Sequence, residues 1–500
     1  MHLQEKRVTW AAMSSRDNVS SVQIIWAVMS SRDIVSSVQI IWAVMSSRDI
    51  VSSVQIIWAA MISRKNVSSA QIIWAVMSSR DIVSSVQILT PALTAQGQYF
   101  RMSGPANELG LIDFGSNDSL CLRRNGSVRK AFLSELQETP NFHIGAGGSR
   151  ILDGSNNHVV SLERLLADYH GAEEGLLFNS GYEANVAIYS TLPQRGDVIV
   201  HDAMIHASIR DGIRAGRASI VKSFAHNDLE SLDRVLEDVK SASQAILEGH
   251  RTVFIAIESF YSMEGDMAPM AEILAHVKHA LPAGNSVFII DEAHSTGLIG
   301  PGGSGYIRHL RLEKECIIQM QSYAKAAGAL GAIVLCNSQI KEFIANYARN
   351  FIYSTGPLFP TVAAIRASVN TLRSLEGDQL RQQLQARVKL FYDLVIQHPK
   401  LDIIQSSGVL KFPTLCDQTL DRCYIPIIPI LTGTGLCHEL QQWLRQQGFL
   451  THALRFPVVL EERIRFVMHV NNTPDNIRAF VRDLMEWGET NMMAISPAQL

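Results

Sequence analysis

Short hydrophobic runs alternate with longer amphipathic stretches from Pro91 to the C-terminus. Many of the runs are rich in β-branched residues and are bounded by polar residues, which is typical of strands. The runs that we predict as strands are 175–178, 197–202, 219–224, 253–259, 287–291, 316–321 and 332–336. One stretch between them, Leu229–Ser241, follows Asn227 and Asp228, which are suitable N-caps for a helix. Strands that alternate with helices predict an α/β fold with a mostly parallel sheet.

The first 90 residues have a different pattern, because they form a tandem repeat. The segment VSSVQIIWAVMSSRDI recurs with few changes, and tryptophans recur every 16 residues at Trp10, Trp26, Trp42, Trp58 and Trp74. A period of this length turns an α-helix by about 160° per repeat, so one long helix would not keep the tryptophans on one face. We therefore expect residues 1–90 to be either a poorly structured, recently duplicated appendage or an interaction array.

Composition and charge narrow the classes of function. The 500 residues are 47% hydrophobic and 18% charged, with a net charge of -3, which argues against nucleic acid and anionic membranes as partners. The six cysteines are dispersed without a CxxC pair, so we expect a reduced protein without a metal site. The chain contains no apolar run of about 18 residues and no secretory signal at its N-terminus. We expect a cytoplasmic protein without a membrane span, with mitochondrial import as the alternative.

Polar residues that can carry chemistry stand at or soon after three of the predicted strands. They are His206, Asp291, His294 and Lys325. Ligands of open α/β sheets bind beyond the carboxyl ends of the strands, so these side chains are expected to share one crevice. A carboxylate can keep a ring nitrogen protonated, an imidazole can stack on a heterocycle, and a desolvated lysine can form a Schiff base. Together these residues predict a site for pyridoxal phosphate.

The segment FNSGYEAN at 178–185 supplies a cradle for the phosphate of that cofactor. Ser180 and Gly181 lie between a predicted strand and a predicted helix, where backbone N–H groups and the helix dipole attract anions. Ser322 offers a hydroxyl three residues before Lys325. Taken alone, a Ser-Gly pair before a helix is an ordinary N-cap.

The letters DEAH at 291–294 also match a helicase box. That chemistry needs a phosphate loop of the form GxxxxGK[ST], and the chain contains no Gly-Lys dipeptide. The helicase interpretation therefore fails.

Several longer segments occur along the chain in a characteristic order. They are LIDFGSNDSLCL, IGAGGSRILDG, FNSGYEANVA, HDAMIHASIRDG, ESFYSMEGDMAPM, IIDEAHSTGLIGPGGSG, SYAKAAGALGA and FIYSTGPLFP. On these segments, the chain from about Leu111 to Ala479 resembles the pyridoxal phosphate-dependent α-oxoamine synthases. That family includes amino-oxononanoate synthase, aminoketobutyrate ligase, aminolevulinate synthase and serine palmitoyltransferase.

The resemblance implies a fold type I architecture of the pyridoxal phosphate-dependent transferases. A large domain with a mostly parallel seven-stranded sheet would be followed by a smaller α+β C-terminal domain. We accordingly expect an N-terminal segment of the enzyme at 91–150, the large cofactor-binding domain at 151–385 and the small domain at 386–500.

The resemblance also assigns roles to the residues at the strand ends. Lys325 resembles the Schiff-base lysine, Asp291 the partner of the pyridine nitrogen, and His206 the ring that stacks on the cofactor. His294 and Ser262 resemble groups near the phenolic oxygen of the cofactor and the substrate carboxylate.

Further positions match residues around the cofactor phosphate and the substrate. Ser180, Gly181 and Tyr182 resemble the phosphate loop, and Ser322 stands where the family usually has threonine. Ser354 and Thr355 resemble residues that reach the phosphate of the neighbouring subunit, which implies a homodimer with shared sites. Asn117 and Arg455 resemble groups that position the substrate and bind its carboxylate.

Two positions depart from the family's SNDYLGL segment. Here the segment reads SNDSLCL, so Ser119 replaces an aromatic residue and Cys121 replaces a glycine. Because an aromatic ring is lost near the entrance, we expect a change in the substrate that is accepted rather than in the reaction.

The implied reaction is a decarboxylative Claisen condensation of an amino acid with an acyl thioester. The acyl group of that thioester would arrive on coenzyme A or on a carrier protein. Lys325, Asp291 and His206 would be its catalytic residues. Two alternatives stay open: another fold type I enzyme, such as an aminotransferase or an aldol-type lyase, and a non-catalytic or repeat-driven interaction protein.

Overall fold

The structure of the chain is a computed structural model that describes residues 110–417, 425–456 and 458–492. The described residues all belong to one compact unit of the chain, Pro105–Leu500. The tandem repeat predicted at 1–90 lies outside the described residues.

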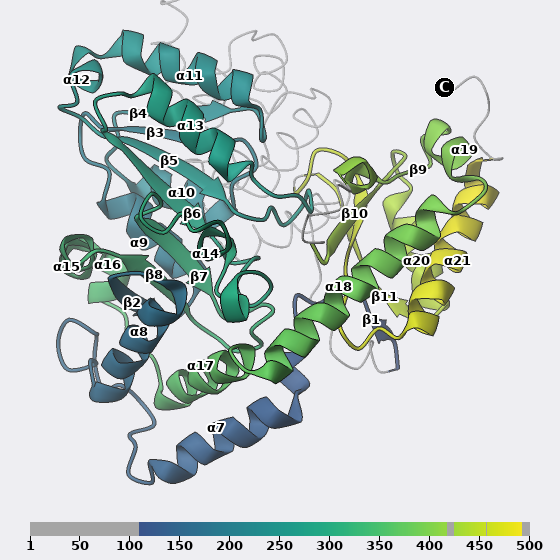
Figure 1. Cartoon of the computed structure of the whole chain (residues 1–500), viewed down its shortest axis with the longest axis horizontal. Coiled ribbons are helices and arrows are strands. Elements are labelled where there is room, and N and C mark those ends of the chain that lie inside the picture. Colours follow the sequence, from purple (N-terminus) through teal and green to yellow (C-terminus); the bar gives the residue numbers. More distant parts are fainter. Residues whose placement is uncertain (1–109, 418–424, 457, 493–500) are drawn as a thin grey trace, which may run out of the picture. The chain divides into compact units, whose positions relative to one another are not determined.

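A seven-stranded sheet forms the centre of this unit (Figure 1). Its order is β2-β8-β7-β6-β5-β3-β4. The strands are β2 (Glu174–Phe178), β3 (Val198–Asp202), β4 (Ile220–Phe224), β5 (Val253–Glu258), β6 (Ser286–Asp291), β7 (Ile318–Ser322) and β8 (Ala332–Cys336). β8 runs antiparallel to both of its neighbours, and the other pairings are parallel. The strand pattern and the mostly parallel sheet are confirmed.

Helices cover both faces of the sheet because its strands are apolar on both sides. Along β3, Val198 and Val200 pack in one hydrophobic cluster and Ile199 packs in the cluster on the opposite face. The helices on the Ile199 side are α9 (Gly181–Thr191), α10 (Ala207–Ala215), α15 (Ser338–Tyr347) and α16 (Arg349–Ile352). The other face packs against α8 (Asn157–His170), α11 (Leu229–Ala242), α12 (Gln244–Leu247), α13 (Met270–Ala280), α14 (Tyr306–Leu310) and α17 (Phe359–Leu372).

The predicted helix after Asn227 and Asp228 is confirmed as α11. Asp228 is its N-cap, and its side chain accepts a hydrogen bond of 2.8 Å from the backbone N–H of Ser231. Asn227 precedes the cap in the left-handed region, with φ 52°.

A second, four-stranded antiparallel sheet follows in the C-terminal part, with the order β12-β13-β10-β9. Its strands are β9 (Leu410–Lys411), β10 (Ile427–Thr432), β12 (His452–Leu454) and β13 (Arg463–Val467). The helices of this part are α18 (Leu375–Ile396), α19 (Leu401–Ser406), α20 (Cys437–Gln446) and α21 (Pro474–Met492). The boundary predicted between residues 385 and 386 falls inside α18.

The beginning of the described chain joins this C-terminal part. Strand β1 (Ile112–Asp113) pairs in parallel with β11 (Phe449–Leu450). The ring of Phe114 stacks on Phe480 of α21 at a centroid distance of 4.5 Å. The chain then continues through η2 (Leu122–Arg124) into α7 (Gly126–Glu138), which packs beside α17 (Figure 1). The pairing places the segment that contains Asn117 next to the second sheet.

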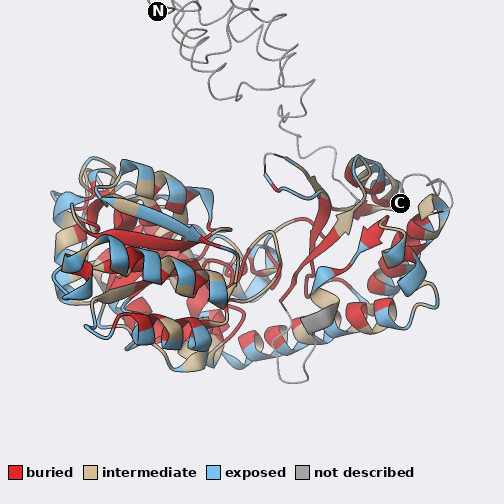
Figure 2. Ribbon diagram, turned by 90° about the horizontal axis from the view of Figure 1, so that it is seen from above, coloured by how far each residue is buried: buried red, intermediate tan, exposed pale blue. Residues whose placement is uncertain are grey.

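Buried residues concentrate in the strands of the large sheet, and the surrounding helices turn exposed residues outward (Figure 2). Two further short 3-10 helices are η3 (Pro301–Gly303) and η4 (Pro413–Asp417). Among the described residues, no helix combines the length and the apolar character needed to cross a bilayer.

Candidate active site

The carboxyl ends of β5, β6 and β7 bring polar residues together at one edge of the large sheet. Glu258 ends β5, Asp291 ends β6 and Ser322 ends β7. Glu258 and Asp291 are direct partners in the parallel register of their strands. All three side chains are buried. They lie at the carboxyl ends of the strands, which is the edge at which open α/β sheets bind ligands.

Asp291 is held in place by two hydrogen bonds. Its Oδ2 accepts one of 2.7 Å from the side-chain amide of Asn185, and its Oδ1 accepts one of 2.9 Å from the backbone N–H of Ala293. Asn185 lies on α9 and is only 2% exposed. A buried carboxylate needs such partners, because an unpaired charge in a protein interior is costly.

Asn185 extends this network to His206. Its amide also donates a hydrogen bond of 3.0 Å to Oγ of Ser208, and that hydroxyl lies 2.7 Å from Nδ1 of His206. The backbone N–H of Ser208 donates to the same Nδ1 at 3.2 Å. Nδ1 of His206 is therefore an acceptor, and in the neutral imidazole the proton is carried by Nε2.

Sequence reasoning did not select Asn185 or Ser208. A signal for Asn185 was present, because it is a polar residue in a helix whose neighbouring positions are small or apolar. For Ser208, we find no distinguishing signal in the sequence.

Lys325 lies in the turn that follows β7 and is half-buried. The turn is closed by a hydrogen bond of 2.8 Å from the N–H of Gly328 to the carbonyl of Lys325. Burial lowers the pKa of Lys325 to about 8, although the negative charges of Asp291 and Glu258 oppose the change. A lysine in this state carries a larger fraction of neutral amine near neutral pH than an exposed lysine.

Two imidazoles lie within electrostatic range of Lys325. His206 is the N-cap residue of α10, and its backbone N–H donates a hydrogen bond of 2.5 Å to Oε1 of Glu258. Burial lowers the pKa of His206, and the charge of Lys325 lowers it further against the opposing charge of Asp291. Burial, followed by the charges of Lys325 and Arg465, lowers the pKa of His294 well below its ordinary value. Both rings are therefore neutral near pH 7.

Glu258 was not selected from the sequence, although it closes a fully buried strand. Burial and the charge of Asp291 raise the pKa of the Glu258 carboxyl well above its ordinary value. The carboxyl accepts a hydrogen bond from the backbone N–H of His206 and so anchors that residue at the end of β5.

The predicted phosphate cradle lies at the N-terminus of α9. Ser180 is the N-cap, and its Oγ accepts a hydrogen bond of 3.2 Å from the N–H of Glu183. A Cβ atom at Gly181 would lie 3.4 Å from the sulfur of Met320 and 3.6 Å from Cβ of Ser322. Gly181 and Ser322 are therefore close neighbours, as the predicted cradle requires. The hydroxyl of Tyr182 instead donates a hydrogen bond to Asp211 on the surface.

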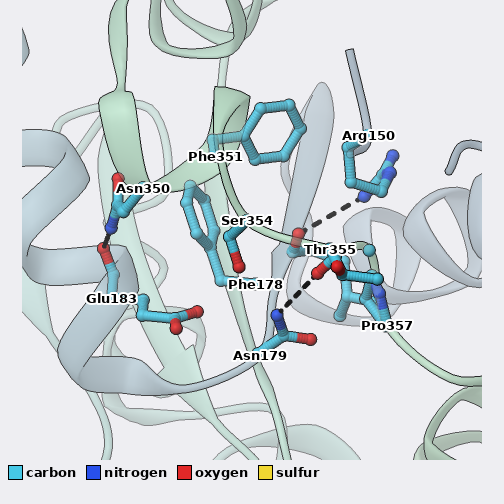
Figure 3. Close-up of a pocket in the computed structure, with 11 residues that line it drawn as sticks. Arg150, Phe178, Asn179, Glu183, Asn350, Phe351, Ser354, Thr355 and Pro357 are labelled. Atoms are coloured by element: carbon cyan, nitrogen blue, oxygen red, sulfur yellow. Dashed lines mark hydrogen bonds between the residues drawn. The ribbon is translucent and has the colours of Figure 1, made fainter. Parts of the chain in front are cut away.

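Ser354 and Thr355 line a small pocket beside this cradle (Figure 3). The side-chain amide of Asn179, the residue before Ser180, donates a hydrogen bond of 3.1 Å to the carbonyl of Thr355. Thr355 also forms an isolated antiparallel bridge with Ser149. The segment with both hydroxyls thus packs near the cradle of its own chain.

A buried arginine joins Asn117 and Ser262. Nη2 of Arg465 donates a hydrogen bond of 2.8 Å to Oδ1 of Asn117, and its Nε donates one of 2.6 Å to the carbonyl of Ser262. The charge of Arg465 also contributes to the lowered pKa values of Lys325 and His294. Arg465 therefore contacts the predicted substrate residues and lies within electrostatic range of Lys325.

The structure places Arg455 in different surroundings. Arg455 follows β12, and its charge acts on Cys437 and His438 at the start of α20. The arginine that meets Asn117 and Ser262 in the described chain is Arg465. A signal for it was present, because Arg463 and Arg465 alternate with apolar residues in the strand sequence RIRFV.

The residues at this edge fit pyridoxal phosphate. An ordered carboxylate, a lysine with a lowered pKa and two neutral imidazoles suit an aromatic aldehyde with a ring nitrogen. The N-terminus of α9, with Gly181 and the adjacent Ser322, suits its phosphate. At Gly181, where the φ angle is ordinary, the absent side chain leaves the backbone N–H groups of the helix open to a close anion.

Comparison with known proteins agrees with this geometry. The family model described as aminotransferase class I and II matches residues 110–484. An 8-amino-7-oxononanoate synthase from Emericella nidulans is 37% identical over 380 residues, which are 75% of this chain and 89% of that protein. An aminoacyl transferase, sphA, from Byssochlamys spectabilis is 34% identical over 411 residues, which are 80% of this chain and 86% of that protein.

Solved structures share the fold. A serine palmitoyltransferase from S. paucimobilis superposes with a TM-score of 0.68 at 23% identity, over 83% of this chain and all of that one (100%). An 8-amino-7-oxononanoate synthase from Francisella tularensis superposes with a TM-score of 0.59 at 25% identity, over 77% of this chain and 99% of that one.

Proposed function

We propose how the residues of this chain condense an amino acid with an acyl thioester. The premise is that the chain belongs to the aminotransferase class I and II family and is a pyridoxal phosphate-dependent α-oxoamine synthase. Carbon dioxide and the free thiol leave, and an α-amino ketone remains. The observation that carries the proposed roles is the position of Arg465, which links Asn117 and Ser262 to the surroundings of Lys325.

The cofactor supplies an electron sink for the carbanion that forms at the α-carbon of the amino acid. Lys325 would hold the cofactor, and Asp291 would keep a proton on its ring nitrogen. Asn185 would fix the carboxylate of Asp291 for that purpose. The phosphate would bind at Ser180, Gly181 and Ser322.

Lys325 would also move the α-proton. With the amino acid bound in the site, Nζ of Lys325 would accept that proton as a general base. General bases work best when their pKa lies near the operating pH, and the pKa of Lys325 is lowered to about 8 by burial.

His206 would act on the acyl thioester. Because its Nδ1 accepts hydrogen bonds from the Ser208 side, its Nε2–H is the donor available to a developing oxyanion on the thioester carbonyl. The neutral His294 would contact the phenolic oxygen of the cofactor from the same edge.

The carboxylate of the amino acid would bind at Arg465, together with Asn117 and Ser262. Guanidinium groups pair well with carboxylates because their N–H groups form a planar fork. Arg465 is 6% exposed, so such a pair would be shielded from water. This assignment differs from the sequence prediction, which placed Arg455 in that role.

A homodimer with shared sites is part of the proposal. Three large apolar side chains near Ser354 and Thr355 are strongly exposed: Ile144 at 72%, Leu152 at 75% and Tyr353 at 73%. The bridge between Ser149 and Thr355 draws their two segments together. Exposed apolar surface of this kind favours burial against a partner. A monomeric mass for the purified full-length protein in sedimentation analysis would refute the dimer.

The cytoplasm is the compartment we propose, on the sequence evidence of dispersed cysteines. Cys121, Cys316, Cys336 and Cys437 are free thiols in the described chain, which suits a reducing compartment. Fractionation of cells that express the full-length protein tests this location, and recovery in mitochondria would contradict it.

The reaction is tested with the purified full-length protein and pyridoxal phosphate. Carboxyl-labelled amino acids are combined with acyl thioesters of coenzyme A and of a carrier protein, and the free thiol and labelled carbon dioxide are measured. We expect equal amounts of the two products, formed only when both substrates are present. An aminotransferase would instead form a keto acid without thiol, and that result would contradict the proposal.

A further inference from the structure

The residues Phe260–Met267 form a closed loop after β5, which we call the Ser262 loop. Phe260 and Met267 form an antiparallel bridge at its base. Inside it, the N–H of Tyr261 donates to the carbonyl of Asp266 and the N–H of Gly265 donates to the carbonyl of Tyr261, both at 3.0 Å. These internal contacts tie the two ends of the loop together, and its outer contacts hold it against the rest of the protein.

One side of the loop is held by β13. Nη1 of Arg463 donates hydrogen bonds to the carbonyl of Met263 at 2.8 Å and to the carboxylate of Glu264 at 3.1 Å. Arg465 donates to the carbonyl of Ser262 at 2.6 Å. The proposed carboxylate site is therefore built partly on the backbone of this loop.

The other side of the loop is held by His226, which follows β4. Nδ1 of His226 lies 2.9 Å from Oδ1 of Asp202, and its Nε2 lies 2.9 Å from Oδ2 of Asp266. Asp202 ends β3 and is fully buried, whereas Asp266 belongs to the loop. The imidazole thus connects the end of β3 in the large sheet to the Ser262 loop.

Asn227 and Tyr261 reinforce this connection. The backbone N–H of Asn227 donates to Asp202 at 2.9 Å and its amide donates to Asp266 at 3.1 Å. The edge of the His226 ring meets Tyr261 at a centroid distance of 4.5 Å. Both ring nitrogens face carboxylates, and both can donate only when the imidazole is protonated.

We propose that Asp202, His226 and Asp266 form a clamp that positions the Ser262 loop and so sets the affinity of the enzyme for the carboxylate of its amino-acid substrate. The proposal rests on the function proposed above. His226 is a positioning residue, because it reaches the substrate site only through the loop.

The clamp depends on the positive charge that His226 places between Asp202 and Asp266. Burial disfavours the imidazolium, but hydrogen bonds to Asp202 and Asp266 outweigh it and raise the pKa of His226 to about 10. The group is therefore positively charged at neutral pH and compensates two carboxylates. Without that charge the carboxylates repel each other, and Asp266 is the one that can yield, together with its loop.

The test uses the full-length holoenzyme with His226→Gln. The amino acid that the wild type accepts is titrated by the change in cofactor absorbance, and kcat and KM are measured alongside. We expect amino-acid affinity to fall about tenfold, which corresponds to about 1.4 kcal/mol, while cofactor affinity and kcat stay near wild type. His276→Gln is the matched control, because it removes an imidazole 2.9 Å from Asp233 on the outer helices. It should leave affinity unchanged.

A second variant and a second readout separate the clamp from general damage and from the proposed function. Adding Asp266→Asn to His226→Gln removes the repulsion, so part of the lost affinity should return. Hydrogen exchange of the peptide 260–267 should rise in His226→Gln and fall again in the double variant, whatever the substrate is. Wild-type affinity with unchanged exchange in His226→Gln, or no recovery in the double variant, would overturn the clamp. A wild type that binds no amino acid, with exchange changed as expected, would refute the proposed function alone.

Discussion

The side-chain amide of Asn185 donates a hydrogen bond of 2.7 Å to Oδ2 of Asp291, which ties α9 to the end of β6. The same amide reaches Ser208 and, through its hydroxyl, Nδ1 of His206. One residue thus orients both the proposed partner of the ring nitrogen and the imidazole proposed to act on the thioester.

Replacing Asn185 by alanine should weaken cofactor binding. A hydrogen bond to a charged group contributes about 1.5–3 kcal/mol, which corresponds to a roughly ten- to hundredfold loss of affinity. Titration of the cofactor-free variant with pyridoxal phosphate measures the change. The control is Asn346→Ala, because that amide bonds only a carbonyl of its own helix on the exposed surface. Equal affinity of Asn185→Ala and wild type would remove Asn185 from the cofactor site.

Arg465 and Arg455 are the two candidates for the ligand of the substrate carboxylate. Substituting each of them by lysine is expected to change the KM for the amino acid by different amounts. Arg465→Lys keeps the charge but loses the fork that reaches Asn117 and Ser262. We expect its KM for the amino acid to rise by about tenfold or more, as for the loss of a charge-assisted hydrogen bond. Arg455→Lys should change this KM far less, because Arg455 acts on Cys437 and His438 instead. The reverse order of effects in steady-state kinetics would restore Arg455 to the role predicted from the sequence.

Cys121 shows why this position of the related family carries glycine. It adopts a left-handed conformation with φ 55° and ψ 29° at the start of η2. Side chains with a Cβ atom are disfavoured there by about 1–2 kcal/mol, and β-branched ones most. Cys121→Val should therefore lower the free energy of unfolding by about 1 kcal/mol, whereas Cys121→Gly should not lower it. Equal denaturation midpoints for the two variants would contradict the strained backbone.

The lowered pKa of Lys325 predicts how cofactor capture depends on pH. Only the neutral amine attacks an aldehyde, and burial lowers the pKa of Lys325 to about 8. The rate of capture by the cofactor-free protein should rise about tenfold from pH 7 to pH 9 and then level off. Stopped-flow absorbance measures this rate, with free Nα-acetyl-lysine as the control. A protein rate that continues to rise in parallel with the control would show an ordinary lysine.

Much of the fold was predictable because the spacing of hydrophobic residues and the local residue types determine which short segments form strands and helices. The seven hydrophobic runs correspond to β2 to β8, since runs rich in β-branched residues between polar boundaries favour strands. The Asp228 cap was predictable for the same reason, because its bond to Ser231 spans three residues. The pairing of β1 with β11 joins residues more than 300 positions apart, and no local pattern announces it.

The site was predictable where a residue stands at a strand end. His206, Asp291, His294 and Lys325 were selected on that ground, and Ser322 was selected because it lies three residues before Lys325. The structure gathers these residues at one edge of the sheet. Their roles stay predictions. Asn185 and Arg465 reach the same edge through side chains from a helix and from the second sheet, so their place depends on tertiary packing. Tyr182 was selected because it follows Ser180 and Gly181 in the predicted phosphate loop. Its hydroxyl instead donates a hydrogen bond to Asp211 at the surface.

The most direct test of the account is to find which lysine carries the cofactor. The full-length protein is loaded with pyridoxal phosphate and reduced with borohydride, and the modified peptide is identified by mass spectrometry. Lys240→Ala, which removes a surface lysine paired with Glu237, serves as the matched control for Lys325→Ala. The account predicts one modified residue, Lys325, with the label and the activity lost in Lys325→Ala and retained in Lys240→Ala. A label on another lysine, or an active Lys325→Ala variant, would contradict the site.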